Sequence, residues 1–166
     1  MFALHLARHV VKPALIHASG GAMHGFDTDT AVWLVTGIAA VESEFRALRQ
    51  HPTGPALGLW QMEPASADDI WTNFLRFRPD LEGRIHAMLA PTHSRDMQLI
   101  DNLRYGAAMA RLQIWRSPSR LPASVDPAMF AAIWKRDYNT AAGKGTEAKF
   151  MQAWTRLVAP AVAEGL

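Results

Sequence analysis

The sequence predicts one mainly α-helical domain that spans residues 1–166. The chain combines 49% hydrophobic with 19% charged residues, a mixture typical of one globular domain with a sizeable core. Apolar residues recur at helical spacing through most of the chain, and the single strand-like stretch lies around Gly58. No internal repeat, low-complexity tract or linker divides the sequence. We therefore expect a single domain.

The segment 31–45 (AVWLVTGIAAVESEF) predicts a central buried helix. It is apolar nearly all the way round a helical wheel, which is typical of a helix surrounded by other elements. Asp27, Thr28 and Asp29 are N-cap candidates directly before it. Near its C-terminal end lie two carboxylates, those of Glu42 and Glu44.

Proline and apolar spacing predict the helices that flank this segment. Residues 1–19 fit an amphipathic helix, because Arg8, His9 and Lys12 interrupt any signal-peptide core. We therefore expect a protein made in the cytoplasm without a signal peptide of its own. Pro64 suits a first helical position, and the helix that it opens is expected to end before Pro79. A short helix is expected over 81–89.

The second half of the chain predicts three further helices. A long one over 95–115 presents Asn102, Gly106 and Ala110 on one face of small residues, against which another helix can pack closely. Asp126 is the N-cap candidate of a helix that runs to about residue 136, and Thr146 is that of the last helix. Between these two helices, residues 138–145 (YNTAAGKG) predict a glycine-containing loop.

Composition and charge exclude several function classes. The absence of cysteine removes disulfide scaffolds, thiol nucleophiles and thiolate zinc sites. The formal charge is +2 and arginine is scattered, which disfavours nucleic acid but suits an anionic polymer such as a bacterial cell wall. His5 and His9 lack a third ligand at a recognisable spacing, so we expect no metal and no cofactor. No apolar run approaches the roughly 20 residues that span a bilayer, so no membrane insertion is expected.

A glutamate on an apolar helix is a candidate general acid. Burial disfavours the charged carboxylate and raises its pKa toward neutrality, where it can donate a proton. Glu42 and Glu44 lie about 200° apart on the wheel, and both of their faces are apolar. Helical spacing alone therefore does not choose between them, and an exposed or ion-paired role at the helix end stays open for each.

Four short segments follow one another in order along the chain. They are Glu42-Ser43, 58–61 (GLWQ), 102–108 (NLRYGAA) and Tyr138-Asn139. Together they resemble the signature of the soluble lytic transglycosylases, which runs Glu-Ser, Gly-Leu-Met-Gln, Asn-x-x-x-Gly-x-x-Tyr and Ala-Tyr-Asn-Ala-Gly at similar intervals. Each segment alone is weakly specific, whereas four in order are specific. The resemblance covers about residues 31–145.

This resemblance implies a lysozyme-like α+β fold, with an active-site cleft between a helical body and a small hairpin lobe. It selects Glu42 as the catalytic acid and implies that Ser43 sits beside it. It further implies that Gln61 lines the sugar-binding cleft and that Tyr138 and Asn139 close over the acid. A tyrosine hydroxyl within hydrogen-bond reach would hold the protonated carboxyl in position.

Two further residues of the motifs are candidates for sugar binding. Asn102 opens the third motif. Trp60 lies in the second motif, where lining of the cleft and packing in the core are equally open, whereas Trp71 is expected in the core.

The chain also departs from the family pattern. Met109 replaces the usual tyrosine, Thr140 and Ala141 stand where Ala-Gly is usual, and the segment between Gln61 and Asn102 is longer. The fit of the substrate is therefore expected to differ. The segments 56–70 and 134–146 additionally resemble small bacteriophage proteins, either lysis enzymes or wall-opening proteins carried by the virion.

The expected function is a peptidoglycan-degrading glycosidase that cleaves the MurNAc-GlcNAc β-1,4 bond, as a bacteriophage endolysin or virion-associated lysin. A lytic transglycosylase needs one carboxylate because a hydroxyl of the substrate attacks, whereas hydrolases generally need a second carboxylate. Glu63, Asp68 and Asp69 could position a water, although acidic residues also favour a first helical turn. The transglycosylase is favoured. A water-using muramidase and a non-catalytic phage structural or wall-binding protein are the alternatives.

Overall fold

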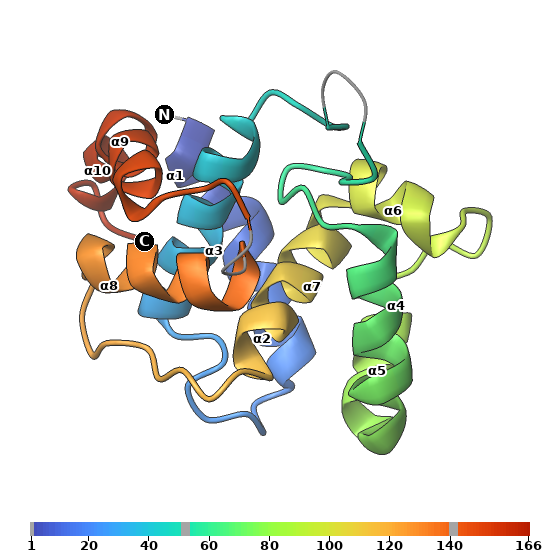
Figure 1. Ribbon diagram of the computed structural model, residues 1–166. Helices are drawn as coiled ribbons and strands as arrows, with labels where there is room; N and C mark the ends of the chain where they lie inside the picture. Colours follow the sequence, from blue (N-terminus) through green and yellow to red (C-terminus); the bar gives the residue numbers. More distant parts are fainter. Residues whose placement is uncertain (1, 51–53, 140–142) are drawn as a thin grey trace.

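A computed structural model describes residues 2–50, 54–139 and 143–166 of the chain. The expectation of a mainly helical protein is confirmed (Figure 1). Thr140 and Ala141, two of the departures from the family pattern, lie outside the described residues. Within the described ranges, no helix is long and apolar enough to cross a membrane.

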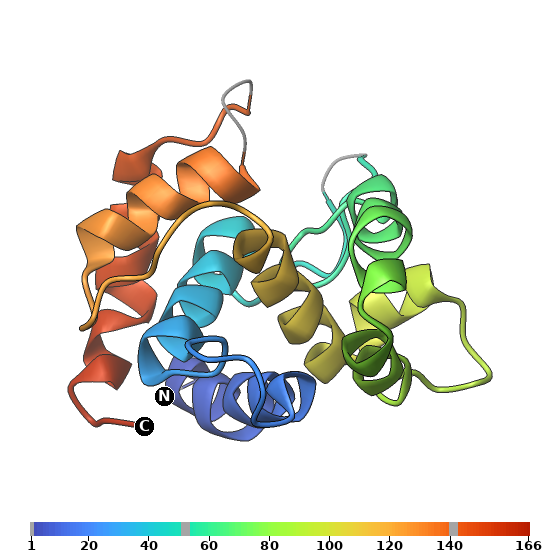
Figure 2. The same cartoon turned by 90° about the horizontal axis from the view of Figure 1, so that it is seen from below.

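The expected central helix is α3 (Asp29–Ser43). Of the three N-cap candidates, Thr28 takes that position, and its hydroxyl accepts a hydrogen bond from the Ala31 amide at 3.2 Å. Almost every residue of α3 is buried, because other helices surround it (Figure 2). The N-terminal stretch packs against it as α1 (Phe2–Leu6), the π-helical turn η1 (Ala7–Val11) and α2 (Lys12–Ser19).

A C-terminal group of helices covers one side of α3. It consists of α8 (Pro127–Ile133), the π-helical turn η3 (Trp134–Tyr138), α9 (Glu147–Leu157) and α10 (Ala159–Val162). The N-caps of α8 and α9 are Asp126 and Thr146, as the sequence predicts. Helix α9 packs along α3, where Gly37 leaves room for the rings of Phe150 and Trp154. The expected loop from residue 138 begins one residue late, since Tyr138 still belongs to η3.

On the other side, the chain forms α4 (Pro64–Asn73), the short 3-10 helix η2 (Leu75–Phe77), α5 (Pro79–His86), α6 (Arg95–Asp101) and α7 (Leu103–Trp115). Pro79 is the first residue of α5, because a proline at this position loses no intrahelical hydrogen bond. The prediction of one helix over 95–115 was wrong. The backbone leaves the helical region at Asn102, whose side-chain oxygen accepts a hydrogen bond from the Tyr105 amide and caps α7.

The segment around Gly58 forms a tight loop. Isolated bridges pair Leu57 with Arg49 and with Met62, and the described residues contain no strand, so the expected hairpin is not shown. Gly58 has a φ of +71°, and a Cβ on it would lie 1.8 Å from the Leu99 carbonyl oxygen. Glycine is therefore required here both for the turn and for the close approach to α6.

The indole of Trp60 fixes this loop against the helical body. Its Nε1 donates to the Val35 carbonyl of α3 at 2.9 Å, and its ring is 1% exposed. Gly106 of α7 lies directly against it, so that a Cβ there would be 2.9 Å from Trp60 Cε3. The small-residue face of α7 thus accommodates an indole at this point, and not the neighbouring helix that the spacing predicts.

Gly106→Ala is expected to destabilise the protein by about 1 to 3 kcal/mol, since the added Cβ would displace a buried indole that is held by its bond to the Val35 carbonyl. Thermal and denaturant unfolding measure this cost. The matched control is Gly83→Ala in α5, where nothing lies within 4 Å of an added Cβ. That variant should gain up to about 1 kcal/mol from helix propensity. Equal effects of the two substitutions would contradict the packing described here.

Candidate active site

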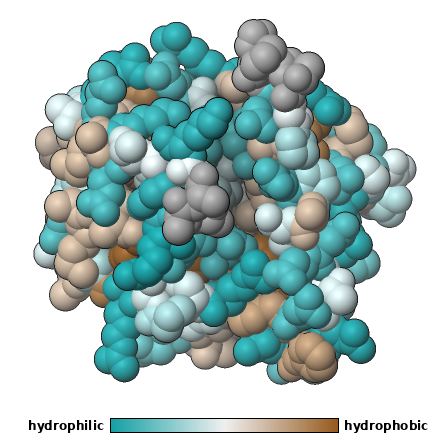
Figure 3. All heavy atoms as spheres, in the orientation of Figure 1, coloured by the Kyte–Doolittle hydropathy of each residue, from teal (hydrophilic) through white to brown (hydrophobic). Residues whose placement is uncertain are grey.

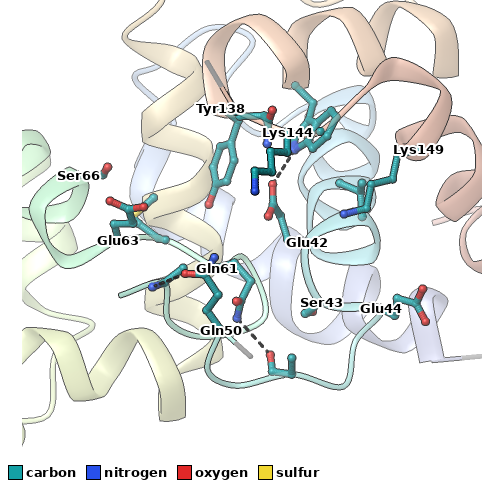
Figure 4. A pocket seen from close by; sticks show the side chains of 18 of the residues that line it. Glu42, Ser43, Glu44, Gln50, Gln61, Glu63, Ser66, Tyr138, Lys144 and Lys149 are labelled. Carbon is teal, nitrogen blue, oxygen red and sulfur yellow. Dashed lines mark hydrogen bonds between the residues drawn. The ribbon is translucent and has the colours of Figure 1, made fainter. Parts of the chain in front are cut away.

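A cleft of about 750 Å³ opens between α3, the loop that precedes α4, and the segment from η3 to α9. This volume lies in the range of sites that bind small molecules or polymer units. Figure 4 shows the side chains of Glu42 and Lys149 on one side, those of Glu63 and Ser66 on the opposite side, and those of Tyr138 and Lys144 between them. Hydrophilic residues also predominate on the face of the molecule seen in Figure 3.

Glu42 lies in the last turn of α3 and lines the cleft. Its Oε1 accepts a hydrogen bond from Trp134 Nε1 at 2.8 Å. Burial raises the pKa of Glu42 from 4.5 to about 7, although the bond from Trp134 and the positive charge of Lys149 act in the opposite direction. The C-terminal end of a helix also disfavours a negative charge. At neutral pH this carboxyl can therefore hold a proton and release it.

Glu44 has a different environment from Glu42. It is the C-cap residue of α3 with a φ of +51°, which turns its side chain away from that of Glu42 (Figure 4). The carboxylate is exposed and forms an ion pair with Arg156 of α9. The ion-paired role that the sequence left open for both glutamates therefore applies to Glu44.

Ser43, expected beside the acid, and Gln61, expected in the cleft, both line the cleft. The buried hydroxyl of Ser43 donates to the Ala39 carbonyl at 3.0 Å and accepts a bond from the Phe45 amide at 3.2 Å. Gln61 adopts a φ of +45°, and its Nε2 donates to the Gly58 carbonyl at 2.8 Å. Residues held at positive φ cost local stability and cluster at functional sites. Here both Glu44 and Gln61 border the cleft.

Tyr138 lines the cleft, but its hydroxyl does not bind Glu42 as the fourth motif predicts. It donates to the Trp60 carbonyl at 2.8 Å. Burial and the nearby Glu42 raise the pKa of Tyr138 well above 10, so it stays a hydrogen-bond donor. Tyr138 thus joins η3 to the loop on the opposite side of the cleft, and the bond to the acid comes from Trp134.

Asn139 follows η3 and also lines the cleft. Its Oδ1 accepts a bond from Lys135 Nζ at 3.0 Å, and the same ammonium donates to the Gly143 carbonyl at 2.7 Å. Gly143 and Gly145 lie so close to Asn139 that a Cβ on either would collide with it. Asn139 therefore positions the segment that leads into α9.

Two expected sugar-binding residues lie outside the lining of the cleft. Trp60 is buried in the core, which decides between the two roles left open for it, and Trp71 is buried as expected. Asn102 caps α7, and its Nδ2 donates to the Met88 carbonyl at 2.8 Å. The amide also donates to Gln98 of α6, so both its oxygen and its nitrogen have partners where α6 meets α7. This structural role accounts for an asparagine at the start of the motif, and no sugar contact is needed.

Of the three acidic residues considered as a second carboxylate, Glu63 is the one that lines the cleft, and it is exposed. Asp68 pairs with Arg95 and Asp69 with Arg116, both away from the cleft. The hydrogen bonds from Asn73 and Arg116 lower the pKa of Asp69, which keeps that carboxylate charged. Both residues act in ion pairs of α4.

Sequence reasoning missed several residues of the cleft, among them Trp134, Lys144 and Lys149. A signal existed for Trp134, because it stands four residues before Tyr138 and therefore on the same helical face. Nothing in the sequence distinguishes the two lysines from other surface lysines, since their position depends on how the segment 143–149 packs against α3.

The arrangement can donate a proton from a partly buried carboxyl into a polar cleft. In the part of the chain that the structure describes, no three His, Asp or Glu side chains come together as metal ligands. No family model, curated protein or solved structure matches this chain.

The raised pKa of Glu42 predicts a stability change with pH. In the unfolded chain the carboxyl ionises near pH 4.5, but in the folded protein it ionises near 7. The folded state therefore binds the extra proton between these values, and the stability from this group falls as the pH rises through that window. Glu42→Gln should match the wild type near pH 4 and exceed it by about 3 kcal/mol at pH 8. Chemical denaturation at both pH values measures the difference, and parallel curves would contradict it.

Proposed function

We propose that this protein is a peptidoglycan-degrading glycosidase that cleaves the MurNAc-GlcNAc β-1,4 bond, with Glu42 as the general acid and a lytic transglycosylase reaction. The observation that carries the proposal is the position of Glu42, in a polar cleft and with a pKa of about 7. A general acid is most effective when its pKa lies near the working pH. The four motifs supply the substrate class.

The charges around the cleft support a polymeric anionic substrate. Arg46, Lys144 and Lys149 all line it. Basic side chains at a cleft attract polyanions and increase the rate of encounter. Peptidoglycan has acidic peptide substituents, which these three basic side chains would attract, although Glu44 and Glu63 line the cleft as well.

The carboxylates favour the transglycosylase over the hydrolase. Besides Glu42, the cleft is lined by Glu44, which pairs with Arg156, and by the exposed Glu63. Attack by a hydroxyl of the substrate needs neither of them. The water-using muramidase is the second candidate, and the observation that favours it is the position of Glu63 opposite Glu42 (Figure 4).

We also propose that the helical arrangement is a variant of the lysozyme-like fold in which the hairpin lobe is reduced to the bridged loop around Gly58. A role as a bacteriophage endolysin or virion-associated lysin follows from the likeness of two segments to small phage proteins. A cleft between two groups of helices, with the acid at the end of the central helix, is compatible with both suggestions.

Glu42→Gln is expected to abolish the clearing of a peptidoglycan gel. The amide oxygen can still accept the bond from Trp134, but the side chain has no proton to transfer. The matched control is Glu44→Gln, two residues away and paired with Arg156, which should retain most of the activity. An active and folded Glu42→Gln protein would refute the assignment of the acid. No clearing by the wild type would favour the non-catalytic wall-binding alternative.

The products distinguish the two reactions. Digestion of purified sacculi in ¹⁸O-labelled water should yield anhydro-muropeptides without the label, as mass spectrometry can detect, because no water attacks the sugar. Glu63→Gln should then leave the rate within about twofold, since it has no role in substrate-assisted attack. Labelled reducing ends, together with a large loss in Glu63→Gln, would instead establish the muramidase reaction.

A further inference from the structure

Trp134 is the one residue whose side chain forms a hydrogen bond with Glu42 among the described residues. An indole N–H can donate but cannot accept. When the carboxyl of Glu42 is protonated, its carbonyl oxygen is a better acceptor than its hydroxyl oxygen, so the indole favours the form with the carbonyl oxygen at Oε1. This form carries the proton on Oε2.

Oε2 is directed toward the cleft. No buried side-chain oxygen or nitrogen in the described residues lacks a hydrogen-bond partner, and no partner of Oε2 is found among those residues. Oε2 is therefore accessible to solvent, and the cleft is the space that Glu42 lines. A substrate oxygen in the cleft would meet the protonated side of the carboxyl.

The indole of Trp134, which determines the favoured oxygen for the proton, is held in place by its neighbours. Trp134 is 1% exposed, and its ring centroid lies 5.7 Å from that of Phe150. Gly145 approaches so closely that a Cβ there would be 2.4 Å from Trp134 Cη2. The ring is buried and in close contact with Phe150 and Gly145, so these contacts hold the direction of its N–H before any substrate binds.

We infer that Trp134 is a positioning residue for the acid: its N–H occupies Oε1 of Glu42, favours the transferable proton on Oε2 and so directs that proton toward the cleft. The inference rests on the proposed function for its catalytic meaning. The hydrogen bond and the location of the proton do not depend on that function, and they can be measured without substrate.

The first experiment uses the wild-type protein. With ¹⁵N-labelled tryptophan, the indole N–H resonance of Trp134 should shift with pH about a midpoint near 7, which is the pKa of Glu42. The indole of Trp60 provides an internal control, because it donates to the Val35 carbonyl and should show no such midpoint. Glu42→Gln, which leaves an acceptor but no titration, should remove the midpoint from Trp134. A Trp134 resonance that does not titrate overturns the inference.

The second experiment removes the donor. Trp134→Phe keeps an aromatic ring but no N–H, so the pKa of Glu42, followed through ¹³C-labelled glutamate, should rise above that of the wild type. Trp154→Phe is the matched control, since Trp154 is buried against Phe150 in the same aromatic cluster but forms no bond to Glu42. An unchanged Glu42 pKa in a folded Trp134→Phe protein overturns the inference. If this variant fails to fold, the wild-type titration decides.

Activity gives a signature that a purely structural role would not produce. Trp134→Phe should lyse walls at roughly a tenth of the wild-type rate or less, because the proton is no longer directed at the substrate. The pH at which activity is lost on the alkaline side should nevertheless rise, because it follows the pKa of Glu42. Trp154→Phe should keep the wild-type profile. An inactive wild type would refute the proposed function and leave both titrations as tests of the hydrogen bond.

Discussion

The position of the Trp60 indole is the constraint on which the cleft depends. Its N–H is bonded to α3, its ring lies against Gly106 of α7, and its carbonyl accepts the hydroxyl of Tyr138 from η3. Three segments that are far apart in the sequence therefore meet at one buried residue. Because Gln61 follows directly, this anchor also fixes where the opposite side of the cleft stands relative to Glu42. An aromatic residue in a motif can thus shape a cleft from the core, without lining it.

Glu42 is a local conflict that the fold maintains. Burial of a carboxyl at the end of an apolar helix lowers the stability of the folded state when that carboxyl is charged. Nearby residues at positive φ lower the stability further. Sites of this kind reduce stability in exchange for a group that is reactive at neutral pH. Arg111 of α7 is a second buried ionisable group, and burial lowers its pKa from 12.5 to about 10. Among the described residues, the non-glycine residues at positive φ are Glu44, Phe45 and Gln61, so the backbone strain lies where α3 ends and in the loop opposite it.

The sequence predicts the elements better than their contacts. Capping residues and apolar spacing located α3, α4, α8 and α9, because these signals act within a few residues of the chain. The spacing predicts Asn102 within a helix because its position on the wheel matches that of Gly106, whereas the amide of Asn102 caps α7 at the point where α6 ends. Periodicity could not separate Glu42 from Glu44, since the left-handed turn that does so begins only after the helix ends. The partner of Tyr138 depends on where Trp60 is anchored, and local sequence does not contain that information.

The π-helical turn η3 has a consequence for how the chain can change in length. Its backbone bond runs from the Asn139 amide to the Trp134 carbonyl, five residues back, at 2.8 Å. A π turn holds one residue more than the α-helical ladder requires. Loss of that residue would restore the α-helical pattern, and because the π turn takes up the extra residue locally, the residues that follow would keep nearly the same orientation. Trp134 and Tyr138 would still lie about one turn apart on the same side of the helix, so a relative with a single-residue deletion here could keep both the bond to the acid and the bond to the Trp60 carbonyl.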